Sequence, residues 1–349
     1  PLYSSAASDV YKRQLFGRTN SAIYLQPFSF AYTSGYFPKY TAETRVALYS
    51  IWGGIPGYWN RLDPGISLSQ NMVTQLLTPN SPYHFEPRLL LVDHVQDPSR
   101  YVSILRAISQ GQATVTEIHQ STGITQSSLS PYLQVMQEAR IIERRIPVTA
   151  KPSSKSGRYF LIDPFLRFYY RFIEPHRAEI EMGLREQTLA DIEMHMARFI
   201  GSHTWEEICR MWVVQGGARG EFGTLPGNVG SEWNREAQID VAAINTASNT
   251  VILGECKWTG KAEGPAVMAK LLEQAEKVMP NGREFRVTLL GFSRSGWTDV
   301  AVEEAGQMVG YQGKNWAVAD VRLLDLDAVD RQLAEWAVDD HFEEWNFLG

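Results

Sequence analysis

The sequence predicts a multidomain α/β protein on three observations. Its 349 residues, 44% of them hydrophobic, are enough for two or three separately cored domains. Residues 98–163 contain a helix, a turn, a second helix and two strands, the order of a winged helix-turn-helix. Residues 200–349 alternate helices and strands, which is typical of a central mixed sheet covered by helices.

A group of helices, residues 15–97, is expected before the winged helix. Thr41 can cap a helix that the Gly53-Gly54 pair ends, SLSQNMVTQLL reads as a second helix, and a third begins near Arg88. Residues 164–199 are expected to form a helical linker. Residues 1–14 lack apolar periodicity and resemble translated sequencing-adapter sequence, so we expect a non-native leader.

The winged-helix region is predicted to begin its short second helix at a cap, either Thr114 or Thr116. The next helix, after Gly123, is the candidate recognition helix. A first turn is the position where Pro131 is tolerated, so this helix should begin near Ser130 or bend there. Two strands, 141–148 and 157–163, are expected to flank a polar loop, the wing.

Local charge favours duplex DNA as the partner of this region. Residues 100–160 contain eight Lys or Arg against three acids, and the acidic end of the chain masks this in the net charge of −6. A protein-docking module is the alternative. The expected DNA contacts are three wing cations and the polar start of the recognition helix: Lys151, Lys155, Arg158, Gln126, Ser127, Ser128 and Ser130.

The stretch QIDVAAINTASNTVILGECKW (238–258) predicts a β-hairpin that carries facing acids. Pairing symmetric about the polar loop NTASNT places Asp240 opposite Glu255, where like charges destabilise. Lys257 shares a face with Glu255, whereas Cys256 points to the core. These charges form either a structural salt bridge or a site for Mg²⁺ or Mn²⁺.

Asp240 together with Glu255-Cys256-Lys257 resembles the PD-(D/E)xK nuclease signature. The resemblance implies a restriction-endonuclease-like α/β domain over residues 200–349, with a metal held by Asp240, Glu255 and an acid of the preceding helix. That acid is Glu206 or, alternatively, Glu207. The catalytic residues that the resemblance implies are Glu206, Asp240, Glu255, Lys257 and Gln274.

The order of LFGR, PFSF, GGIPGY, the winged helix and ECKW resembles the C-terminal two-thirds of prokaryotic AAA/STAND P-loop ATPases, often called archaeal-type ATPases. The resemblance covers the chain after Leu15 and implies a truncated ATPase whose helical lid is residues 15–97. It places Arg18, Gly54 and Pro56 near the nucleotide. No GxxxxGK[ST] occurs in the sequence, so ATP binding is expected only with a missing N-terminal P-loop domain.

Two functions are therefore expected as alternatives. One is a DNA-associated, Mg²⁺-dependent endonuclease gated by the ATPase; the other is a non-catalytic DNA-binding or regulatory ATPase whose nuclease-like domain is a binding module. The two cysteines lack CxxC spacing, which argues against structural zinc. No stretch approaches the roughly 18 apolar residues of a membrane span, so a cytoplasmic protein is expected. The sequence does not specify an oligomeric state.

Overall fold

The computed structural model describes residues 25–92, 98–280 and 282–343, and their contacts divide them into two units. The first, called the helical unit, comprises the described parts of Pro1–Phe28, Gly54–Glu143 and Tyr159–Thr188. The second, the sheet unit, comprises the described parts of Ser29–Gly53, Arg144–Arg158 and Leu189–Gly349. Each unit is therefore assembled from stretches distant in sequence, and the wing tip clusters with the sheet unit.

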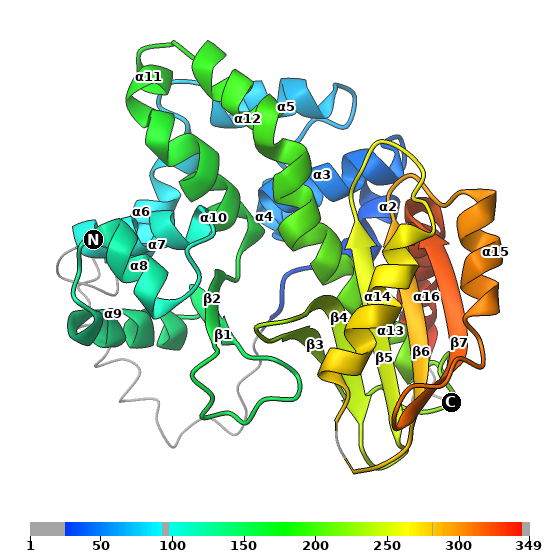
Figure 1. Cartoon of the computed structure of the whole chain (residues 1–349). Helices are drawn as coiled ribbons and strands as arrows, with labels where there is room; N and C mark the ends of the chain where they lie inside the picture. The colour runs from blue at the N-terminus through cyan, green and yellow to red at the C-terminus, as the bar shows by residue number, and fades with distance from the viewer. Residues whose placement is uncertain (1–24, 93–97, 281, 344–349) are drawn as a thin grey trace. The chain divides into compact units, whose positions relative to one another are not determined.

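The sheet unit contains a five-stranded mixed sheet, as the sequence predicts (Figure 1). The first three strands pair antiparallel and the last three pair parallel. In spatial order they are β3 (Asn228–Trp233), β4 (Gln238–Asn245), β5 (Thr250–Lys257), β6 (Phe285–Ser293) and β7 (Trp316–Asp325).

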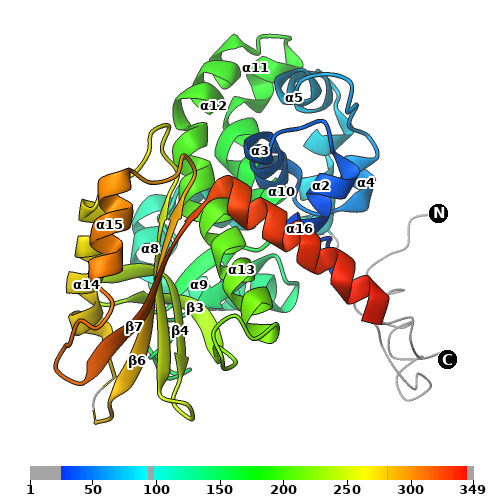
Figure 2. The same ribbon diagram turned by 90° about the vertical axis from the view of Figure 1, so that its right-hand side faces the viewer.

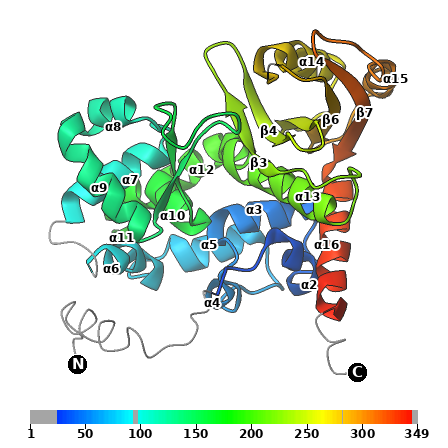
Figure 3. The ribbon, with the colours of Figure 1, turned by 90° about the horizontal axis from the view of Figure 1, so that it is seen from below.

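Helices cover both faces of this sheet and bury an apolar cluster on each. Figure 3 shows α14 (Ala266–Val278) and α15 (Asp299–Gln307) on one side and α13 (Glu206–Ala218) on the other. The α14 side buries Leu253, Met268, Leu271 and Val287. Fully burying one such side chain contributes roughly 1.5–3 kcal/mol, so these faces hold the strands in place.

The α13 side is closed by α16 (Leu326–Glu343), which runs beside α13 in Figure 2. Trp212 and Trp336 meet there with ring centroids 5.8 Å apart. The first stretch of the sheet unit adds α2 (Thr33–Tyr36) and α3 (Ala42–Trp52), and Arg45 of α3 forms a buried ion pair with Asp330 of α16. The acidic C-terminal region that the sequence showed is thus partly an amphipathic helix.

The winged helix is present. Its helices are α7 (Pro98–Ser109), α8 (Val115–Thr122) and α9 (Gln126–Glu138). Its two strands, β1 (Ile142–Arg145) and β2 (Arg158–Leu161), are shorter than expected. Thr114 caps α8 in a capping box with Glu117, which settles the choice between Thr114 and Thr116. The expected start of the recognition helix near Ser130 is wrong. α9 begins at Gln126 and continues through Pro131, because the loss of one intrahelical hydrogen bond is outweighed by the burial of its apolar face.

Apart from α12, the other α-helices of the described residues are short. The expected helix SLSQNMVTQLL is present as α5, and a capping box of Ser67 and Gln70 begins it. The predicted linker is not one continuous helix, since Gly183 adopts a φ of 80° between its last two segments. No helix in the described parts is long and apolar enough to cross a membrane. The remaining α-helices are α4 (Pro56–Trp59), α5 (Leu68–Leu76), α6 (Glu86–Val92), α10 (Pro164–Phe168), α11 (Arg177–Glu181) and α12 (Glu186–Phe199).

Candidate active site

The predicted hairpin register is confirmed for the paired part of the two strands. Val241 pairs with Gly254, and Asn245 pairs with Thr250. Asp240 lies one position beyond the last pair, next to an irregularity in the pairing of β4 with β3, and its charge interacts with that of Glu255. The Asp240 carboxylate accepts a hydrogen bond from the Cys256 N–H at 3.0 Å. This hydrogen bond holds the Asp240 carboxylate against strand β5. Because the Asp240 side chain is also short, the position of its carboxylate is well defined.

Glu255 and Lys257 form an ion pair on the same face of β5. Glu255 is buried, whereas the side chain of Lys257 is 30% exposed. Burial lowers the pKa of Lys257, but its bond to Glu255 and the charges of Glu255 and Asp240 outweigh this and raise the pKa above its usual value. Lys257 therefore carries its positive charge at the edge of the acid pair.

Glu206 begins α13, and its carboxylate is 3.3 Å from the Arg210 guanidinium. Burial first, and then the charge of Asp240, raise the pKa of Glu206 to about 8 although Arg210 opposes this. Burial and the charge of Glu255 likewise raise the pKa of Asp240 to about 6. The three acids thus share a negative potential that two cations do not fully neutralise.

Arg210 is a central residue of this region. Its guanidinium donates to the Asp240 carbonyl at 2.9 Å and to the Ser231 hydroxyl at 2.9 Å, besides pairing with Glu206. Sequence reasoning missed it, although the spacing of four between Glu206 and Arg210 is a helical ion-pair signal. The alternative acid, Glu207, pairs instead with Arg145 at 2.9 Å.

The structure gathers only part of the predicted metal set. Asp240 and Glu255 lie close enough for their charges to interact, but no group of three or more His, Cys, Asp or Glu able to hold a metal occurs in the described ranges. Gln274 lies on α14, which packs against β5, and its side-chain oxygen is buried without a hydrogen-bond partner among the residues the structure describes. Asp240 and Glu255 by themselves suit Mg²⁺, which binds through one or two carboxylates and retains waters.

The predicted DNA-binding residues divide between the two units. On α9 of the helical unit, Gln126, Ser127, Ser128 and Ser130 are all exposed. On the wing, Lys151 and Lys155 are exposed as well. Arg158 differs, because its guanidinium lies 4.8 Å from the Trp233 ring centroid and donates to Gln238 at 3.4 Å.

The nucleotide contacts expected from the resemblance are placed only in part. Arg18 lies outside the described residues, as do residues 1–14. Pro56 is the exposed first residue of α4. A side chain at Gly54 would place its Cβ only 1.7 Å from the Phe28 carbonyl oxygen, so close packing of two backbone segments already explains this glycine.

Comparison with known proteins finds two family matches, over different parts of the chain. Residues 97–144 match a family described as bacterial regulatory protein, arsR family, and residues 169–268 match one described as archaea bacterial proteins of unknown function. An uncharacterized protein of Methanocaldococcus jannaschii is 28% identical over 256 residues, which are 71% of this chain and 55% of that protein. The chain thus spans about half the length of that relative. No solved structure matches significantly.

These matches support an arsR-type winged helix, a module of DNA binding or regulation, over α7 to α9. The second match contains Glu206, Asp240, Glu255 and Lys257 but ends before Gln274. The matched family has no assigned chemistry, so the function of that region is inferred from its own residues.

Proposed function

We propose that this chain binds duplex DNA through its winged helix and cleaves phosphodiesters at the site of Asp240, Glu255 and Lys257. The observation that supports this is the proximity of two carboxylates on adjacent strands, whose charges interact, with a protonated lysine paired to one of them. A nucleic-acid-cleaving site needs these parts: oxygen ligands for a cation, and a positive group for the phosphate.

In this proposal Asp240 and Glu255 hold a divalent cation, which when bound supplies an activated water and offsets phosphate charge. Lys257 donates from its ammonium to the nucleophile or to the phosphoryl oxygens as their negative charge grows. Glu206, whose pKa is raised to about 8, is protonated in part near neutral pH. It completes the acid set after it gives up its pairing with Arg210.

Cleavage of supercoiled and linear duplex DNA by the full chain with Mg²⁺ or Mn²⁺ tests the catalytic part. We expect Asp240→Asn and Glu255→Gln to lower the rate at least about a hundredfold, because each removes a ligand charge. Lys257→Met should bind Mn²⁺ in calorimetry yet cleave slowly. The matched control is Glu273→Gln, an acid of α14 whose side chain is 71% exposed, and it should cleave normally.

The DNA-binding part has a separate test. Basic residues mainly contact phosphate, so affinity for a short duplex should fall as salt rises, and Lys155→Ala should reduce the log-log slope by about one. Lys314→Ala, which removes an exposed lysine between α15 and β7, should leave the slope unchanged. Salt-independent binding would indicate a protein-docking module instead.

The second candidate is a non-catalytic regulatory or DNA-binding module, and one observation favours it. Glu206 and Glu255 each already have a cationic partner within the protein, Arg210 and Lys257. If calorimetry detects no Mg²⁺ or Mn²⁺ binding and the alanine variants of Asp240 and Glu255 only change stability, this candidate is the correct one.

A further inference from the structure

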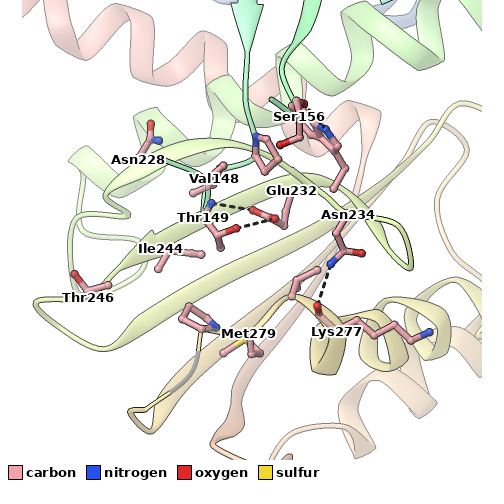
Figure 4. Close-up of a pocket in the computed structure, with 15 residues that line it drawn as sticks. Val148, Thr149, Ser156, Asn228, Glu232, Asn234, Ile244, Thr246, Lys277 and Met279 are labelled. Carbon is pink, nitrogen blue, oxygen red and sulfur yellow. Dashed lines mark hydrogen bonds between the residues drawn. The ribbon is translucent and has the colours of Figure 1, made fainter. Parts of the chain in front are cut away.

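The sheet unit contains a cavity of about 600 Å³ between the wing, strands β3 and β4 and the C-terminal end of α14 (Figure 4). This volume is in the range of small-molecule sites. Its apolar lining includes Val148, Ile244, Val278 and Met279, and Trp233 adds an indole. Asp240, Glu255 and Lys257 are not among its lining residues, so the cavity is a separate feature.

The cavity contains a carboxylate that lacks a cation. Glu232 is 4% exposed, and its two oxygens accept hydrogen bonds from the Thr149 N–H and hydroxyl, each at 2.9 Å. Burial raises the pKa of Glu232, the two Thr149 bonds oppose this, and no described lysine or arginine contributes. A buried carboxylate bonded only to neutral donors is costly unless a positive group joins it.

The lysine that lines the cavity already has an acidic partner. Lys277 contributes to the cavity wall, but its ammonium pairs with Glu273 at 2.7 Å, and Figure 4 shows its side chain extending away from Glu232. Arg158 lies against Trp233, with no bond to Glu232 in the described structure. No lysine or arginine of the described residues therefore pairs with Glu232, which leaves this carboxylate available to a cation from outside the chain.

We propose that this cavity is a binding site for a small organic cation, a guanidinium or primary ammonium group on a short apolar chain. The cation bonds the Glu232 carboxylate beside the two Thr149 donors. Its chain lies against Val148, Ile244 and Met279. Because Val148 and Thr149 belong to the wing, the ligand contacts the wing and the sheet strands at once. This proposal does not depend on nuclease activity.

Calorimetry with two matched probes tests the proposal on the full chain. Butylguanidinium and butylurea have nearly the same shape, but only the first is charged. We expect butylguanidinium to bind saturably and butylurea to bind at least about tenfold more weakly, since hydrogen bonds to charged groups are the stronger ones. Equal binding of the two probes, or no binding of butylguanidinium, would overturn the proposal.

Two variants locate the site. Glu232→Gln should lower butylguanidinium affinity at least about tenfold, whereas Glu236→Gln, which removes an exposed charge from the same β3–β4 connection, should not. Ile244→Trp should block binding by filling the cavity. Circular dichroism and the unfolding temperature verify that each variant is folded. Unchanged affinity in both folded Glu232→Gln and folded Ile244→Trp contradicts the site.

Discussion

Three acids of the sheet unit, each at least partly buried, are balanced in different ways. Glu206 and Glu255 each have a cationic partner from the chain, whereas Glu232 has only the neutral donors of Thr149. Even so, the pKa of Glu206 is raised to about 8. The comparison teaches that one cation, Arg210, does not offset the burial of Glu206 and the charge of its neighbour Asp240. It also teaches that Glu232, a buried acid without a cation, leaves room for one from outside.

The largest expected effect comes from removing the cation that joins the acid cluster. Arg210→Ala should lower the free energy of unfolding by about 2–4 kcal/mol, because it leaves Glu206 and the Asp240 carbonyl without their donor in a largely buried place. Urea denaturation at pH 7 measures this. Arg286→Ala, which removes an exposed arginine from β6, is the control. Equal losses in both variants would show that Arg210 is an ordinary surface residue.

Measuring stability over a range of pH tests the raised pKa of Glu206. The pKa of Glu206 rises from 4.5 to about 8, so the folded state binds its proton more tightly, and stability falls as pH rises through this window. Glu206→Gln should remove that fall and gain roughly 1–3 kcal/mol over the wild type at pH 8.5, with little gain at pH 4. Denaturation midpoints at several pH values measure it. A gain that does not depend on pH contradicts the assignment.

The smallest effect is expected at the acid without a cation. Its pKa is raised by burial, so Glu232→Gln removes a charge that the fold disfavours but weakens the bonds from Thr149. We expect a net change of about 0–1 kcal/mol at pH 7 in the stabilising direction. Glu236→Gln should be neutral. A clear destabilisation by Glu232→Gln would mean that its carboxylate mainly fastens the wing.

The sequence was sufficient where local pattern sets the structure. The hairpin register followed from a polar loop between apolar strands, and the structure confirms it from Val241 to Asn245. The cap at Thr41, and Thr114 as one of two candidate caps, were predicted for the same reason, since a capping residue bonds within its own first turn.

Long-range packing was not readable from the sequence. Strand β3 was missed because glycines and polar residues interrupt its alternation, and its outer side is covered by the wing through the bond from Val148 N–H to Ser231 O at 3.1 Å. Strand β7 carries Asp320 and Arg322 and showed no clear apolar pattern. The apolar spacing of Leu326, Val329, Leu333 and Trp336 in α16 was present, but the surrounding acids obscured it.

The ion pair between Arg45 and Asp330 has a consequence for how the chain acquires its structure. The two residues are 285 positions apart, and α3 packs with α16 in one core. Closing so long a loop is slow, and during synthesis α3 must wait until α16 has been made. An expression fragment begun at residue 200 would lack α3 and the wing tip, would expose the apolar surface that they cover, and should aggregate.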